Sequence, residues 1–415
     1  MSPRRPGDAG GNAVVFAGSG RRTTWAELSP AGRDLVPDGG PTAYGVVGNA
    51  EALPIVLGHA RAGAETLLTT AGRLDETMRA ELTADGFAVM AGGVRTEPTA
   101  TRPGEPGRLW LLTSGSTGRP KRIGHTLASL TTVTAGRPPQ TWLCPYLPGS
   151  YAWWQLVTLG LGVPGQDLVM LDPGRDEWTP AATAYGVTAV SGTPTFWRRA
   201  LIGEGPALAR LGLRQITLGG EPVDQAVLDE LRAVFPAARI SWIYASSEVG
   251  ASIVVHDGRA GFPAGWLDRE TPGRPRLRIV GGPEGGELLI SSPHHGAGLA
   301  GEVATGDAVR REGDRILITG RLDRDEINVG GAKASAGRVR EVLLSHPDVA
   351  WATVRGRRAP LVGSVVVAEV VDRSGGLDVA DLTRWAAGRL PDYAVPRRIS
   401  VLPAIPVKES LKSDV

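Results

Sequence analysis

The sequence contains a single cysteine, Cys144, among its 415 residues. A lone cysteine can form neither an internal disulfide nor a cysteine-based zinc cluster, and it fits a reducing compartment. The first twenty residues lack the continuous apolar stretch of a signal peptide, because Arg4 and Arg5 are followed by glycine and alanine. We therefore expect a cytoplasmic protein without disulfides.

Long apolar runs and an excess of charge are also missing. No stretch approaches the about eighteen uninterrupted apolar residues that cross a bilayer, and the longest candidate, 361–371, contains Gly, Ser and Glu. Lys and Arg number 45 against 43 Asp and Glu, so the net charge of +2 provides no broad basic field. Neither a membrane nor a nucleic acid is therefore an expected partner.

Lysine is scarce in this sequence. Of the 45 basic residues only four are lysine, and these are Lys121, Lys333, Lys408 and Lys412. A lysine that persists in such a sequence can mark a position where a compact ammonium works and a planar guanidinium does not. The four lysines are candidate functional residues, with ordinary surface positions as the alternative.

The rest of the composition is that of a folded protein with more than one domain. Hydrophobic residues make up 42% of the chain and charged residues 21%, close to the globular average. At about 150 residues per domain, 415 residues predict one large domain and a smaller one. The 57 glycines and 32 prolines indicate many turns between the elements.

Short apolar runs alternate with helix-like stretches in the first hundred residues, which is typical of a parallel α/β sheet. The expected strands are 13–17, 44–47 and 66–68, and the expected helices are 24–35, 50–62 and 74–85. The pattern continues with strands expected at 109–112, 188–191, 215–218 and 239–244. Small and polar residues follow these strands, where such sheets bind their ligands.

The last third of the sequence reads differently. Strands about eight residues apart are expected at 276–280, 287–290 and 315–318, which indicates a β-rich subdomain. A polar stretch at 321–326 then leads to a compact α+β tail. We predict a large N-terminal α/β domain at 1–321, with parallel sheets, helices and the β-rich subdomain, and a small α+β domain at 322–415.

A loop rich in hydroxyls and glycines follows the expected strand 109–112. Its hydroxyls, unhindered amides and closing lysine form a set of donors for phosphate oxygens. The candidate phosphate-binding residues are Thr113, Ser114, Gly115, Ser116, Thr117, Gly118 and Lys121. The loop is not a Walker A loop, because Lys121 lies between Pro120 and Arg122. A Ser/Gly loop without a ligand is the alternative.

This loop resembles the phosphate loop of the adenylate-forming enzymes, which include acyl-CoA and aryl-CoA ligases, nonribosomal peptide adenylation domains and firefly luciferase. Five further segments resemble motifs of that family in the same order, at 219–222, 244–248, 305–307, 320–323 and 327–331. Six ordered matches over most of the chain are highly specific. The resemblance implies a large N-terminal domain and a small mobile C-terminal domain, with the active site between them.

The resemblance also implies the nucleotide site. Beyond the loop, the implied ATP- and AMP-binding residues are Gly219, Gly220, Glu221, Pro222, Tyr244, Ala245, Ser246, Asp307 and Arg321. Two glycines let a planar base lie against the backbone, Tyr244 stacks on its other face, and Asp307 accepts bonds from the ribose hydroxyls. Core packing of Tyr244 and capping by Asp307 of the turn that leads to 308–311 are the alternatives.

The implied catalytic residues are Glu248, Ser247 and Lys412. Glu248 suits Mg²⁺ that bridges the leaving pyrophosphate, and a solvated glutamate at a helix start is the alternative. The family's lysine follows a glycine near the chain end, so Lys412 matches if Leu411 replaces that glycine, and Lys408 is the competitor. Leucine takes a positive φ less readily than glycine does.

The hinge and thiol tunnel of the family match further positions. Asp323 matches the hinge, although the segment 321–327 carries one residue more than the usual pattern. Gly330 and Gly331 match the face along which a phosphopantetheine arm passes. In this interpretation, residues 322–415 form a mobile lid that carries the catalytic lysine.

The acid pocket is the least readable part. The resemblance places it in 142–154 and 192–197, and the candidate residues are Tyr146, Ser150, Tyr151, Gly192 and Thr193. The many aromatic residues there favour a small acid, aromatic acids among them, over a long acyl chain. Aromatic packing in the core is the alternative. No acidic residue stands out to pair with an α-amino group, which disfavours an amino acid.

The sequence thus predicts an ATP- and Mg²⁺-dependent ligase. It would adenylate a small carboxylic acid and pass it to coenzyme A or to the phosphopantetheine of a carrier protein. Delivery to an amine acceptor is one alternative, and a degenerate nucleotide-binding module without turnover is the other. The chain is shorter than the usual family member, mostly before Thr113, so a reduced subfamily is expected.

Overall fold

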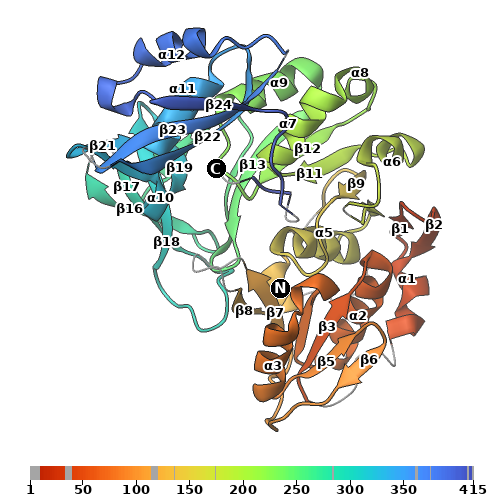
Figure 1. The fold of residues 1–415 in the computed structure, drawn as a ribbon. Coiled ribbons are helices and arrows are strands. Elements are labelled where there is room, and N and C mark those ends of the chain that lie inside the picture. The colour runs from red at the N-terminus through yellow and green to blue at the C-terminus, as the bar shows by residue number, and fades with distance from the viewer. Residues whose placement is uncertain are drawn as a thin grey trace.

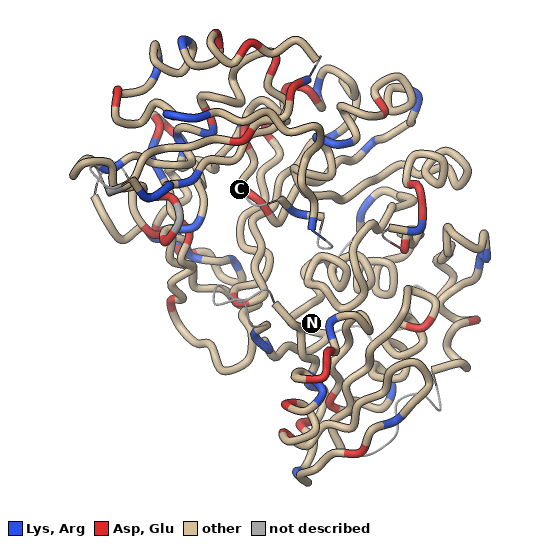
Figure 2. Tube along the Cα trace, viewed as in Figure 1, with Lys and Arg blue, Asp and Glu red and all other residues tan. Residues whose placement is uncertain are grey.

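The computed structural model describes most of the chain, namely residues 10–32, 40–113, 120–134, 136–172, 174–282, 285–359, 363–373, 375–408 and 411–413. Within these residues the strands form four sheets, and helices cover them (Figure 1). Acidic and basic residues are interspersed along the chain (Figure 2), as expected from its small net charge.

The largest sheet has eight described strands in the order β14-β13-β12-β11-β9-β10-β1-β2. Their bounds are β1 Ala13–Phe16, β2 Arg21–Thr24, β9 Gln140–Cys144, β10 Gln166–Met170, β11 Ala189–Gly192, β12 Gln215–Gly219, β13 Arg239–Ser246 and β14 Gly250–Val255. The inner strands pair in parallel, and the edge strands β2 and β14 run antiparallel.

Different layers cover the two faces of this sheet. On one face, apolar side chains of β11, β12 and β13 share a core with the helices α6 (Trp178–Ala184), α7 (Pro194–Gly203) and α9 (Gln225–Val234). On the other face, the core with helix α5 (Tyr151–Gly162) includes residues of β9 and β10 and only Ala189 of β11. The second face of β12 and β13 is therefore left for a cavity. The short helix α8 (Gly205–Leu208) follows α7.

A second sheet of six described strands has the order β6-β5-β3-β4-β7-β8. Its strands and helices are β3 Thr42–Val46, β4 Thr66–Thr70, β5 Ala88–Ala91, β6 Val94–Thr96, β7 Leu109–Thr113, β8 Lys121–His125, α1 Trp25–Leu28, α2 Asn49–Ala62, α3 Glu76–Ala84 and α4 Leu127–Leu130. Strands β3, β4, β5 and β7 pair in parallel, whereas β6 and β8 are antiparallel edges.

The β-rich subdomain is an antiparallel sheet of five described strands in the order β15-β19-β18-β17-β16. Their bounds are β15 Phe262–Pro263, β16 Arg276–Gly282, β17 Gly285–Ser291, β18 Val303–Glu312 and β19 Arg315–Arg321. The alternative role of Asp307 as the cap of the turn that leads to 308–311 is wrong, because Asp307 and these residues lie inside β18.

The C-terminal part has its own core, made of residues between Ile327 and Ile399. Its elements are α10 Leu322–Asp325, β20 Glu326–Val329, β21 Ala332–Ser335, α11 Ala336–Leu344, β22 Val349–Ala359, β23 Gly363–Asp372, α12 Val379–Ala387 and β24 Arg398–Leu402. From β24 the chain returns to the middle of the molecule (Figure 1), where its last described residues, 411–413, lie beside the turn that follows β12.

The predicted fold class is confirmed: a large α/β part with parallel sheets and a β-rich subdomain precedes a small α+β part. One predicted helix, 24–35, is wrong over 24–32, while 33–35 lie outside the described residues. Helix α1 ends at Leu28, and a 3₁₀ turn, Ser29–Gly32, follows it. Pro30 explains the early end, because proline has no N–H to donate in a longer helix. No helix in the described part of the chain is long and apolar enough to cross a membrane.

A buried histidine predicts that the stability of the large domain is sensitive to acid. His59, on α2, is 2% exposed, and its Nδ1 lies 2.8 Å from the carbonyl oxygen of Ala64. Burial lowers the pKa of His59 from 6.5 to about 4. The unfolded state therefore holds more protons between these two values, so stability falls as the pH falls through this window.

We expect His59 to contribute about 2 kcal/mol of lost stability between pH 7.5 and pH 5. Urea unfolding at both pH values measures it, and His59→Gln is the matched variant because glutamine does not titrate. The pH dependence should be smaller in His59→Gln by about this amount. An equal pH dependence in both proteins would contradict the assignment.

Candidate functional site

A cavity of about 1490 Å³ lies between the eight-stranded sheet, the β-rich sheet and the end of the chain. Most of the site residues expected from the sequence line it, namely Thr113, Lys121, Tyr146, Ser150, Tyr151, Thr193, Gly219, Gly220, Glu221, Pro222, Tyr244, Ala245, Ser246, Ser247, Glu248, Asp307, Arg321, Asp323 and Lys412. The parallel strands β12 and β13 end at this cavity, which is where open α/β sheets bind ligands.

Some expected residues fall elsewhere. Ser114, Gly115, Ser116, Thr117 and Gly118 lie outside the described residues. Gly330 and Gly331 lie in the exposed turn between β20 and β21, away from the cavity wall. Gly192 is also not part of the wall. A Cβ atom there would lie 2.3 Å from Cδ1 of Phe196, so this glycine makes room for an aromatic ring.

The glycine turn after β12 receives the lysine from the end of the chain. Gly220 has a φ of +85°, and a Cβ atom on it would lie 3.0 Å from Cε and 3.4 Å from Nζ of Lys412. A side chain at this position would push the lysine away. The structure thus brings together two residues that the sequence analysis singled out separately.

Lys412 is half-buried among charged groups. Burial lowers the pKa of Lys412, while the carboxylates of Glu221, Asp307 and Glu248 act to raise it and Arg73 acts to lower it further. An anionic ligand next to the ammonium would favour its charged form. Lys408, the competing lysine, also lines the cavity, but it is exposed.

The residue before Lys412 has the backbone conformation that a glycine would favour. Leu411 has a φ of +60°, and Asp268 is the other non-glycine with a positive φ in the described residues. The hydroxyl of Thr193 donates a hydrogen bond to the carbonyl oxygen of Leu411. The leucine side chain packs against the cores on both faces of the large sheet. This packing and this hydrogen bond offset the cost of the left-handed conformation.

Ser413, which was not predicted from the sequence, connects the end of the chain to both the large domain and the C-terminal domain. Its backbone N–H donates to Glu221 over 2.8 Å, and its hydroxyl lies 2.7 Å from the hydroxyl of Thr195. The indole N–H of Trp351, on β22, donates to the same hydroxyl over 3.0 Å. These bonds fix the residue next to Lys412 and thereby the backbone that carries this lysine into the cavity.

Asp307, on β18 of the β-rich sheet, lines the cavity with both carboxylate oxygens engaged. Tyr244 donates its hydroxyl to one oxygen over 2.5 Å, and Arg321 donates to the other over 3.2 Å. Burial raises the pKa of Asp307, and the bonds from Tyr244 and Arg321 oppose that shift. Each carboxylate oxygen retains a further lone pair for a ligand hydroxyl.

Glu248 lies in the turn that joins β13 to β14. Its N–H donates to the Ser246 hydroxyl over 3.2 Å, and His125 fixes the turn through a 2.7 Å contact to the Ser247 carbonyl oxygen. No group of three acidic, histidine or cysteine side chains in the described residues could hold a metal. A single glutamate still fits Mg²⁺, which is commonly bound by one or two carboxylates plus substrate phosphates.

The expected hinge takes the form of a short helix, α10, in which Asp323 is exposed at the cavity edge. Asp325 makes the contacts instead: its carboxylate accepts bonds from Ser335 over 2.8 Å and from the backbone N–H of Gly337 over 2.6 Å. The extra residue of this segment leaves two aspartates near the expected position. The hinge at Asp323 stays a prediction.

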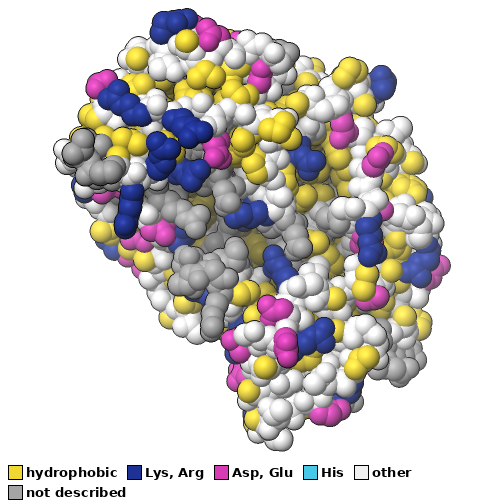
Figure 3. Space-filling model, viewed as in Figure 1, with side chains coloured by type: hydrophobic (Ala, Val, Ile, Leu, Met, Phe, Trp, Pro, Cys, Tyr) yellow, Lys and Arg dark blue, Asp and Glu magenta, His cyan; other side chains and the backbone are white. Residues whose placement is uncertain are grey.

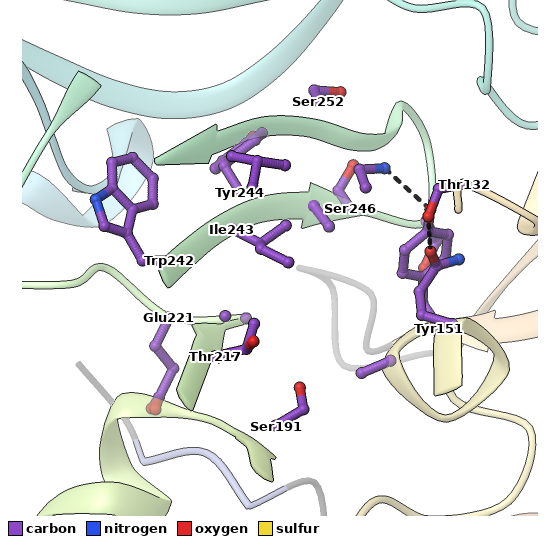
Figure 4. A pocket seen from close by; sticks show the side chains of 18 of the residues that line it. Thr132, Tyr151, Ser191, Thr217, Glu221, Trp242, Ile243, Tyr244, Ser246 and Ser252 are labelled. Atoms are coloured by element: carbon purple, nitrogen blue, oxygen red, sulfur yellow. Dashed lines mark hydrogen bonds between the residues drawn. The ribbon is translucent and has the colours of Figure 1, made fainter. Parts of the chain in front are cut away.

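The expected acid pocket is built from α5 and the floor of the large sheet. Tyr151 accepts a hydrogen bond from the backbone N–H of Ala251 over 2.9 Å (Figure 4), and the Tyr146 hydroxyl lies 3.0 Å from that of Ser191. For the larger aromatic residues the alternative reading is correct. Trp153, Trp154 and Trp197 are buried in the cores and are not part of the cavity wall.

The AMP-binding enzyme family model matches residues 49–300 of this chain, and the model of the AMP-binding enzyme C-terminal domain matches residues 339–412. An acetyl-coenzyme A synthetase of Drosophila melanogaster is 27% identical over 350 residues, which cover 73% of this chain and 52% of that protein. The match to a novobiocin biosynthesis protein of Streptomyces niveus covers a similar share of that protein, 55%. The chain thus spans about half the length of these two relatives.

Two solved structures illustrate the likeness of the fold. An anthranilate CoA ligase in complex with anthranoyl-AMP has a TM-score of 0.75 at 17% identity, and the match covers 99% of this chain and 93% of that one. An amide bond synthetase from Marinactinospora thermotolerans has a TM-score of 0.71 at 23% identity, with coverage of 98% and 96%.

Proposed function

This chain belongs to the AMP-binding enzyme family, the adenylate-forming enzymes. From that premise we propose that it uses ATP and Mg²⁺ to activate a small carboxylic acid as an acyl-adenylate. We further propose that it transfers the acyl group to a thiol. The position of Lys412 carries the proposal. This lysine comes from the end of the chain and lies over Gly220, in the cavity that Asp307 and Glu248 also line.

The proposed first step brings two anions together, so its transition state must be stabilised by positive charge. A carboxylate oxygen of the acid attacks the α-phosphorus of ATP, the bond from that phosphorus to the bridging oxygen breaks, and pyrophosphate leaves. Negative charge gathers on the phosphoryl oxygens in the transition state. Ser413 anchors the backbone beside Lys412 before the reaction, so the lysine can bring its ammonium to this charge with little movement of the chain.

The other residues would hold the nucleotide. Asp307 would accept the ribose hydroxyls, with Tyr244 and Arg321 keeping its carboxylate in place. The base would lie against the backbone of Gly219 and Gly220. Mg²⁺ held by Glu248 would supply a cation for the leaving pyrophosphate.

Coenzyme A or a carrier-protein phosphopantetheine is the proposed acceptor, reached after the C-terminal domain turns about the segment near Asp323. The exposed residues Arg355, Arg357 and Arg358 lie on β22, and basic side chains gather on this part of the surface (Figure 3). Such a patch suits the phosphates of coenzyme A or an acidic carrier domain. An amine is the second candidate acceptor, supported by the likeness to an amide bond synthetase.

Pyrophosphate release from ATP and Mg²⁺, without any acceptor, tests the first step across small aromatic and aliphatic acids. Release that depends on one class of acid is the expected result. ATP binding without release for any acid would favour the degenerate nucleotide-binding module instead. Product analysis after adding coenzyme A, a loaded carrier protein or an amine then separates the acceptors.

Leu411 offers a further prediction. Leu411→Gly keeps the positive φ at no steric cost, so pyrophosphate release should stay within about threefold of the parent. Leu411→Val should lower it at least about tenfold, because a β-branched residue resists this conformation and Lys412 is then displaced. Pyrophosphate release by the two variants is compared with that of the parent protein. Equal activity of the two variants would show that the backbone at Leu411 does not position the lysine.

A further inference from the structure

The cavity continues along the large sheet beyond the residues assigned to the nucleotide. Ser191 of β11, Thr217 and Gln215 of β12 and Ser241 of β13 line this part, and Figure 4 shows Ser191 and Thr217 pointing into the pocket. Each of these four side chains carries a hydroxyl or an amide. These four positions make part of the cavity floor polar, beside the apolar side chains of Trp142, Trp242 and Ile243, which also line the cavity.

The polarity is confined to one face of these strands. Successive side chains of a strand point to opposite faces, and the intervening Ile216, Leu218 and Ile240 are at most 2% exposed in the core under the sheet. Central parallel strands covered on both faces are usually apolar throughout. Gln215, Thr217 and Ser241 thus depart from that pattern on the cavity side, whereas Ile243 follows it, so the floor suits an occupant that carries a polar group on an apolar body.

The floor residues form a connected chain of hydrogen bonds. Nε2 of Gln215 donates to Oγ1 of Thr217 over 3.2 Å and to Oγ of Ser241 over 3.1 Å. Oγ of Ser241 lies 2.7 Å from Nδ1 of His256, and burial together with nearby arginines lowers the pKa of that imidazole. These bonds align the floor and leave Oε1 of Gln215 without a partner among the hydrogen bonds of the described residues.

The acidic groups of the cavity are separated from this floor. The acidic side chains among its described lining residues are Glu221, Glu248, Asp307 and Asp323, all from the nucleotide side. The floor offers neutral donors and acceptors, and Arg137, which also lines the cavity, acts with Arg239 to lower the pKa of His256. A neutral oxygen substituent fits this arrangement better than an ammonium group, which would find no carboxylate there.

The spacing of residues along a strand gives the length of this part of the cavity. At about 3.3 Å per residue, Thr217 lies about 7 Å and Gln215 about 13 Å along β12 from Gly219. We propose that the Thr217–Gln215–Ser241 floor is the specificity subsite for the acid, and that the acid carries a hydroxyl or similar neutral oxygen group at its end remote from the carboxylate. This inference rests on the proposed function, since it places the carboxylate beside Gly219 and Lys412.

Two matched pairs of acids of suitable length test the subsite: octanoate with 8-hydroxyoctanoate, and cinnamate with 4-hydroxycinnamate. Calorimetry in the presence of AMP measures their affinities without turnover. In the parent protein we expect the hydroxylated member of at least one pair to bind about tenfold more tightly. In Gln215→Leu and Ser241→Ala this ratio should fall to within about threefold.

Gln225→Leu is the matched control, because Gln225 also makes several hydrogen bonds but lies on α9, outside this cavity. It should keep the parent ratio. Equal or tighter binding of the unsubstituted acids, a ratio that survives both floor variants, or no binding of any of the four acids would overturn the inference. Pyrophosphate release by the same samples is independent: hydroxyl-selective binding without release would contradict the proposed function and leave the subsite standing.

Discussion

Replacing Lys412 with alanine is expected to lower pyrophosphate release at least about a hundredfold, as the loss of a positioned transition-state charge should. The lysine occupies the space that a side chain at Gly220 would take, and the carboxylates of Glu221, Asp307 and Glu248 act on its charge. Nothing in the folding of the sheets requires an ammonium there. The effect should therefore appear in the rate, while the thermal unfolding midpoint changes little.

Lys408→Ala is the matched control. The structure assigns Lys408 a backbone role: its N–H donates to the carbonyl oxygen of Lys412 over 2.8 Å, and its own carbonyl accepts from Leu411. Alanine retains both of these bonds, so we expect pyrophosphate release within about threefold of the parent. A large loss in Lys408→Ala with little loss in Lys412→Ala would move the catalytic role to Lys408.

Local sequence patterns predicted the strands and their ends well. The segments expected at 44–47, 215–218 and 239–244 match β3, β12 and β13 to within two residues at each end. The reason is that parallel strands carry a dense apolar signal and end at small or polar residues. The motif order then brought Gly220, Asp307 and Glu248 to one cavity, as the resemblance implied.

Long-range contacts could not be predicted from the sequence. The bond between Ser413 and Glu221 joins residues 192 positions apart, and no local pattern marks a serine for this purpose. The floor residues Gln215 and Ser241 had a visible signal, polar residues alternating with apolar ones on two strands, but its meaning depends on which face is open. Only the packing of α5 on the other half of the sheet leaves that face uncovered.

The contact between the large and small parts of the protein predicts the second large effect. Asp224 is 11% exposed, and both its oxygens lie 2.6 Å from Nη2 of Arg198, which is 4% exposed. Arg340 of α11 lies 3.9 Å from the same carboxylate, and Arg198 also donates to the carbonyl oxygen of Ala350 on β22. Burial alone would raise the pKa of Asp224, but the two arginines hold it below its ordinary value.

Asp224→Ala should therefore lower the free energy of unfolding by about 3 to 5 kcal/mol, because it leaves two buried arginines without a carboxylate. Glu230→Ala is the control, since the Glu230–Arg373 pair also joins the two parts but is more exposed, and it should cost less than about 1 kcal/mol. Chemical denaturation of both variants measures the difference. If the C-terminal domain separates first in Asp224→Ala, protease should cut near the segment 321–326 before the large domain unfolds. Equal, small effects in the two variants would show that the buried cluster does not hold the C-terminal domain over the cavity.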